Sequence, residues 1–193
     1  MSKEDFAQNL TGNYYYSEPG AVDVTLDFIT PFVAGLGLIG KGIKTANIAK
    51  NAKLVEELNK KSKVWGKAYK SASGNAEKAI KLLKQKRQGF VPNADNQGTD
   101  FVWGEYVAPT KPNEKGKGFG LAHIEGRRNE QGINGSEYLD TIPNLMNNGR
   151  TFYKEDHPGR FYKELGNQEA IIRTDYNGEP WQWLNSSYYK NIE

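Results

Sequence analysis

Apolar and polar positions repeat with two different periods along the chain. Between Ala76 and Leu83 the apolar residues recur at helical spacing, Asn75 precedes them as a typical N-cap, and Gly89 follows. This pattern predicts a helix over Ala76–Gln88. The stretch 28–70 also has a helical pattern, interrupted by glycines.

Shorter apolar runs predict further elements in the middle of the chain. We expect helices over Gly120–Arg128 and Tyr138–Asn148, a strand over Asp100–Trp103 and a flexible loop over 107–118.

The last quarter of the chain has the pattern of antiparallel strands. Asn177-Gly178 between two strand-like runs is a strong hairpin signal. A two-residue loop pairs Tyr176 with Glu179 and Ile172 with Trp183. Helices followed by such a meander predict an α+β fold. The runs are Thr151–Lys154, Arg160–Leu165, Glu169–Tyr176 and Glu179–Tyr189.

Composition excludes several kinds of chemistry. The 193 residues are 37% hydrophobic, which is enough for a core, and they include no cysteine. Disulfides, thiol catalysis and cysteine-ligated metals are therefore excluded. With only His123 and His157, and no HExxH, EF-hand, P-loop or dinucleotide motif, we expect neither a metal nor a cofactor.

Charge is distributed unevenly, although the net charge is only +3. Residues 41–90 hold 14 basic and 3 acidic side chains, a net charge of +11, whereas residues 91–193 hold 11 basic and 15 acidic ones, a net charge of −4. The lysine-rich block at residues 44–70 is able to attract phosphate backbones or anionic lipid, or it is a solvated helix surface.

Phe28–Ile43 is the most apolar segment. It contains Pro31, four glycines and Lys41, so it is not a regular membrane span, although it suits a buried or membrane-touching segment. The N-terminus is polar and lacks the apolar region of a signal peptide.

The segment GFGLAHIEGRR carries the first candidate chemistry. On a helix, His123 and Arg127 are four residues apart and project together. An imidazole transfers protons near neutral pH, and a guanidinium binds phosphate oxygens. This pair suits metal-free phosphodiester cleavage, although a histidine that only packs the helix is the other interpretation. Arg128 lies closer to the apolar side.

The closing strand WQWLNSSYY and its neighbours supply further candidates. Alternation sends Ser186 and Tyr188 to one face, where their hydroxyls are able to bind phosphate. Arg173 is expected opposite Gln182, on the face of Ser186. His157 lies in the turn EDHPGR, where a histidine is usually just exposed.

Five blocks in order carry a resemblance to a known family. GNAEKAIKLLKQKRQGFVPNA, TDFVWG, GFGLAHIEGRR, IPNLMNNG and EAIIRTDYNGEPWQWLNSSYY resemble the phage and polymorphic-toxin branch of the barnase–EndoU–colicin–RelE-like (BECR) endoribonucleases. The resemblance spans about residues 74–189. It implies N-terminal helices packed on a four- or five-stranded antiparallel sheet, and metal-independent cleavage of RNA, often tRNA.

The resemblance also implies roles for individual residues. His123 is matched to the catalytic histidine, Arg127 or Arg128 to the phosphate-binding residue, Ser186 to the hydroxyl of the closing strand and Tyr188 to the aromatic hydroxyl after it. Because Asn185 stands where similar proteins often have an apolar residue, a one-residue shift would transfer the role of Ser186 to Ser187.

A second resemblance lies in the N-terminal segment VDVTLDFITPFVAGLGLIGKGIK, which is similar to the apolar, glycine-rich pre-toxin segments of bacterial polymorphic toxins. It implies a pre-toxin or translocation region over 1–73, a nuclease domain over 74–193 and a cognate immunity protein. The protein would be a secreted or delivered effector that acts in the target-cell cytoplasm during contact-dependent competition, with transient membrane contact during delivery.

Two other functions stay open. Phe28–Ile43 and the lysine-rich block suit a non-enzymatic, membrane-active or binding module. An ADP-ribosyltransferase toxin also mixes helices with small sheets, although the chain lacks that group's Arg, Ser-Thr and Glu-x-Glu series.

Overall fold

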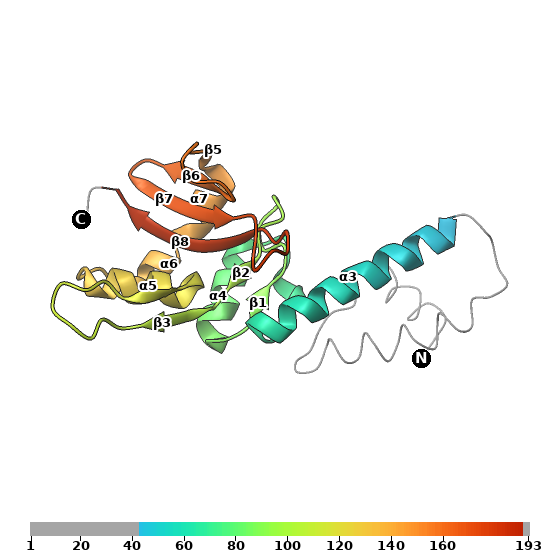
Figure 1. Ribbon diagram of the computed structural model, residues 1–193, viewed down its shortest axis with the longest axis horizontal. Coiled ribbons are helices and arrows are strands. Elements are labelled where there is room, and N and C mark those ends of the chain that lie inside the picture. Colours follow the sequence, from blue (N-terminus) through green and yellow to red (C-terminus); the bar gives the residue numbers. More distant parts are fainter. Residues whose placement is uncertain (1–42, 191–193) are drawn as a thin grey trace. The chain divides into compact units, whose positions relative to one another are not determined.

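The computed structural model describes residues 43–190 of the chain (Figure 1). The chain divides into two compact units, residues 1–64 and 65–193, whereas the sequence predicted a boundary after residue 73. In the first unit, the described part is most of helix α3 (Ile43–Trp65), with an ion pair between Glu57 and Lys61 at 2.8 Å. Most of Phe28–Ile43 lies outside the described residues.

The second unit is built on a four-stranded antiparallel sheet in the order β5-β6-β7-β8. Its strands are β5 (Arg150–Phe152), β6 (Arg160–Leu165), β7 (Gln168–Arg173) and β8 (Trp183–Tyr189). The meander follows the chain, as the turn-separated strand pattern predicted. The mixed α+β class is therefore confirmed.

Helices pack against this sheet on one side (Figure 1). They are α4 (Ala76–Lys86), α5 (Gly120–Glu130), α6 (Gly135–Leu139) and α7 (Ile142–Asn148), with a 3-10 turn η1 at Lys70–Ala72. One apolar cluster joins helical side chains such as Ile80 and Leu121 to Phe161, Ile172 and Leu184 of the sheet. Burial of this cluster holds the helices on the sheet.

Two small ribbons complete the unit. Strands β1 (Phe90–Val91) and β2 (Phe101–Val102) pair with each other, as do β3 (Glu105–Val107) and β4 (Lys117–Phe119). The segment 107–118, expected to be a loop, has its two ends in β3 and β4. These ends pair with each other, so the segment forms the connection of a hairpin.

The local signals predicted the start of α4 better than its end. The Asn75 side chain accepts a hydrogen bond from the Lys78 amide at 2.8 Å, as expected of an N-cap. The helix then ends two residues earlier than predicted, because Arg87 takes the left-handed conformation at φ +55°. Gly89 does not end the helix but allows two backbone segments to pack closely, since a Cβ there would lie 2.3 Å from the Lys67 carbonyl oxygen. The expected helix over Tyr138–Asn148 is two helices, α6 and α7.

The hairpin turn was predicted correctly, but its register was not. Tyr176 pairs with Glu179, whereas Ile172 pairs with Leu184 instead of Trp183, and Arg173 with Trp183 instead of Gln182. Pro180 has no N–H for the ladder. A bulge between the β7 residues Ile171 and Ile172 shifts the register once more.

This register decides which side chains share a face of the sheet. Cross-strand partners point to the same face, and neighbours along a strand to opposite faces. Ala170 and Ser187 are partners on the helix-covered face, whereas Glu169 and Tyr188 are partners on the other, which we call the open face.

Candidate active site

The predicted site residues fall into two groups on opposite sides of the sheet. His123, Arg127 and Arg128 lie on α5, which packs against β8 from the helical side, and Ser187 points to that side. Ser186, Tyr188 and Arg173 belong to the open face. The sheet therefore separates residues that the sequence had assigned to one site.

His123 is partly buried beside Tyr106, with ring centroids 6.5 Å apart. Its Nδ1 atom is enclosed and has no hydrogen-bond partner among the described residues. Burial lowers the pKa of His123, and the nearby Arg127 and Arg128 lower it further, against a hydrogen bond with the Lys117 backbone that raises it. The imidazole is therefore mostly neutral near pH 7.

The two arginines after it contact other side chains, although Nε and Nη1 of Arg128 are buried without a hydrogen-bond partner among the described residues. Arg127 forms an ion pair with Glu130, which also accepts hydrogen bonds from the Tyr106 hydroxyl and, at 3.1 Å, from the Gly116 amide. Arg128 is 4% exposed and lies 5.4 Å above the ring of Tyr138. Burial lowers the pKa of Arg128.

Ser187 has a structural environment. Its hydroxyl donates to the Glu169 carbonyl at 2.9 Å and lies 2.8 Å from the Tyr138 hydroxyl, and the residue is fully buried. The Ser187 hydroxyl therefore makes both of its hydrogen bonds within the core.

The open face brings together a different set of groups. Tyr188 donates a hydrogen bond to the carboxylate of Glu169, and the Lys154 ammonium lies 3.3 Å from Oε1 of that carboxylate. Lys154 also lies 4.1 Å from the ring centre of Tyr162, and the Tyr162 hydroxyl bonds Nδ1 of His157. We call these five residues the sheet-face cluster.

The residues of the sheet-face cluster differ in their exposure to solvent. Glu169 and Tyr162 are buried, whereas the side chains of Lys154 and His157 are 36% and 40% exposed. Burial raises the pKa of Tyr188, and the Glu169 carboxylate raises it further, so the phenol keeps its proton. An imidazole, an ammonium and a phenol thus meet solvent above a buried carboxylate.

The sequence interpretation named Tyr188 as a site residue but missed Glu169, Lys154 and Tyr162 and ranked His157 low. Glu169 is the cross-strand partner of Tyr188, so only a correct register of the hairpin would have revealed it. The predicted two-residue loop, without the bulge, places a different residue opposite Tyr188. His157 and Lys154 come from the loop between β5 and β6, whose path the local sequence does not specify.

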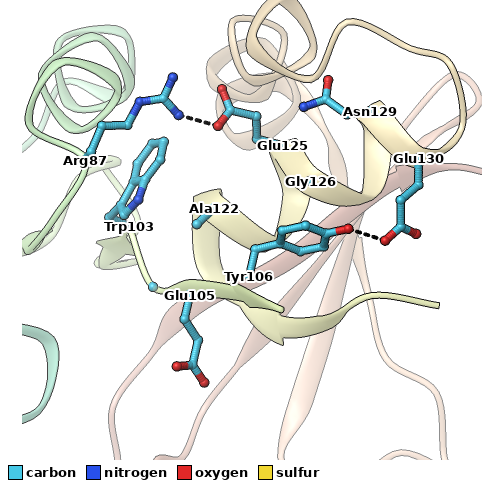
Figure 2. Close-up of a pocket in the computed structure, with 10 residues that line it drawn as sticks. Arg87, Trp103, Glu105, Tyr106, Ala122, Glu125, Gly126, Asn129 and Glu130 are labelled. Carbon is cyan, nitrogen blue, oxygen red and sulfur yellow. Dashed lines mark hydrogen bonds and ion pairs between the residues drawn. The ribbon is translucent and has the colours of Figure 1, made fainter. Parts of the chain in front are cut away.

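A cleft of about 440 Å³ lies on the outer side of α5 (Figure 2). Arg87 stacks 4.7 Å above the Trp103 ring and pairs with Glu125, while Tyr106 bonds Glu130. The predicted His–Arg pair does not line this cleft. Its lining residues are Arg87, Trp103, Gly104, Glu105, Tyr106, Ala122, Glu125, Gly126, Asn129 and Glu130.

Within residues 43–190, no cluster of three or more histidine and carboxylate side chains is arranged to hold a metal ion. None of the helices in that range combines the length and the apolar character needed to cross a bilayer. Comparison with protein-family models, with curated proteins and with solved structures finds no match to the chain.

Proposed function

We propose that the chain is a metal-independent toxin endoribonuclease whose reaction takes place at the sheet-face cluster. The observation that carries the proposal is that Lys154 and Tyr188 meet the buried Glu169 carboxylate. Lys154 also lies over the ring of Tyr162, whose hydroxyl bonds His157. These residues supply proton transfer and positive charge without a metal. A sheet with helices on one side is also compatible with the BECR resemblance.

RNA is the substrate class that suits these groups, because its 2′-hydroxyl is a built-in nucleophile. In the tautomer in which Nδ1–H of His157 donates to the Tyr162 hydroxyl, Nε2 accepts the 2′ proton as the O2′–P bond forms. Lys154 stabilises the charge on the phosphoryl oxygens, whereas the single O–H of Tyr188 donates to Glu169 and helps to fix that carboxylate. The P–O5′ bond breaks, and the 5′ oxygen takes a proton from water.

Glu169 is a positioning residue in this scheme. Its carboxylate orients both the Lys154 ammonium and the Tyr188 hydroxyl from below the surface. The products are a 2′,3′-cyclic phosphate and a 5′-hydroxyl end. Transfer RNA is the proposed target, in the cytoplasm of a competing cell, and an immunity protein is the proposed inhibitor.

The two histidines provide a matched test. His157→Ala should lower RNA cleavage about 10²- to 10⁴-fold, because it removes the proton acceptor. His123→Ala should retain cleavage within a few-fold. Mapping of RNA ends after brief expression in cells, and cleavage of purified tRNA with EDTA present, measure both variants beside the wild type.

Other outcomes contradict the proposal in distinct ways. Loss of cleavage in folded His123→Ala, with cleavage intact in His157→Ala, would move the reaction to α5. Intact RNA with the folded wild type would exclude a ribonuclease, and consumption of NAD would indicate ADP-ribosylation instead.

A further inference from the structure

Two arginines face each other across the open face, next to the sheet-face cluster. Arg160 on β6 is the direct partner of Arg173 on β7. Like charges directly opposite each other in a sheet are destabilising unless an anion lies between them. This pair therefore marks a place on the surface that gains stability when it binds a negative group.

The protein provides only part of that negative charge. Arg173 forms an ion pair with Asp175 at 3.2 Å, and both side chains remain more than a third exposed. The Arg160 side chain forms no hydrogen bond or ion pair within the described range 50–190, and the residue is partly exposed. The pair thus keeps an excess positive charge at the surface.

Strand β6 fixes the position of the two arginines relative to the sheet-face cluster, because it carries both Arg160 and Tyr162. Arg160 precedes Tyr162, the residue that bonds His157, by two positions on β6, so both point to the open face. Two residues of an antiparallel strand span about 7 Å. This is comparable with the separation of neighbouring phosphates in an extended nucleic acid strand.

We infer that Arg160 and Arg173 form a second phosphate subsite, which binds the phosphate next to the one that is cleaved. The inference rests on the proposed function for the identity of the first phosphate. Guanidinium groups suit this role because they bind phosphate oxygens in a bidentate manner. The substrate is then a single-stranded RNA segment that lies along the β6 and β7 strands, and a single phosphodiester does not fill the site.

Binding of single-stranded DNA tests the subsite without cleavage, since DNA has no 2′-hydroxyl. Anisotropy of a labelled oligothymidylate at several salt concentrations gives the number of phosphate contacts. Arg160→Gln and Arg173→Gln should each reduce the slope of log K against log salt by about 0.7. Lys81→Gln removes one charge from exposed α4 and should leave the slope unchanged.

Cleavage provides the second measurement. On the RNA that the wild type cleaves, each arginine variant should raise KM roughly tenfold and retain kcat, because the lost contact is made equally before and during reaction. Circular dichroism checks that each variant is folded.

The outcomes separate the two proposals. If the arginine variants match Lys81→Gln in both slope and KM, the subsite is overturned while the ribonuclease stands. If no protein cleaves RNA but the slopes fall as expected, the nucleic-acid site stands and the proposed reaction does not.

Discussion

At the scale of single residues, burial and pairing distinguish the two histidines more clearly than their sequence neighbours do. His123 follows the pattern of a helix with a basic residue four positions on, yet its Nδ1 is enclosed and Arg127 is paired with Glu130. His157 lies in an unremarkable turn, yet it touches a hydroxyl beside a lysine and a carboxylate.

The lowered pKa of His123 predicts a dependence of stability on pH. Below the unfolded value of about 6.5, the unfolded chain binds a proton that the folded chain resists. The free energy of unfolding should therefore fall as the pH drops from 7 to 5, and His123→Gln should reduce that fall. Urea unfolding at several pH values measures it, with His157→Gln as the matched variant. An equal pH dependence in wild type and His123→Gln would contradict the assignment.

The raised pKa of Tyr188 predicts the opposite behaviour at alkaline pH. Because the folded state holds the phenolic proton more tightly, its stabilising contribution is complete below about pH 10 and is lost as the pH rises above that. Tyr188→Phe should lose stability less steeply than the wild type between about pH 9 and 11. Chemical denaturation at each pH tests this, and parallel curves would show that Tyr188 titrates normally.

At the scale of elements, hydrogen-bonding side chains and glycines control where helices and turns begin. Asn75 and Asn177-Gly178 act within a few residues of chain, which is why their effects were predictable. The bulge at Ile171 was not predictable, because it depends on how β7 and β8 pair while both pack against the core.

Removal of the α4 N-cap has a definite expected cost. Asn75→Ala should reduce the free energy of unfolding by about 1 kcal/mol, since the Lys78 amide loses its acceptor. Gln85→Ala, at an exposed position of the same helix, should change it by less than about 0.5 kcal/mol. Urea denaturation compares the two variants, and equal effects would mean that the cap adds nothing.

At the scale of the whole molecule, the segment before α4 belongs to the second unit. The Trp65 ring packs against Phe90 and Trp181 with centroids 5.5 and 5.0 Å apart. The Tyr69 amide donates to the Phe90 carbonyl at 2.8 Å, and Ala72 is fully buried. The folding unit therefore includes residues that the sequence interpretation had assigned to the pre-toxin region.

Two fragments test this boundary. A chain of residues 65–193 should unfold cooperatively, whereas a chain of residues 74–193 should be strongly destabilised, because it loses the apolar burial of Trp65, Tyr69 and Ala72. Thermal and urea unfolding of both fragments measure the difference. Equal stability would place the boundary at residue 73.

The sequence alone determined what short-range physics controls. Helical periodicity, the Asn75 cap and the Asn177-Gly178 turn act between neighbouring residues, so α4, the hairpin and the α+β class were predictable. Only the tertiary structure decided which chemical groups meet. A single bulge pairs Tyr188 with Glu169, and one loop path brings His157 to Tyr162, on the face of the sheet away from α5. Strand register and loop packing depend on contacts between residues distant in sequence.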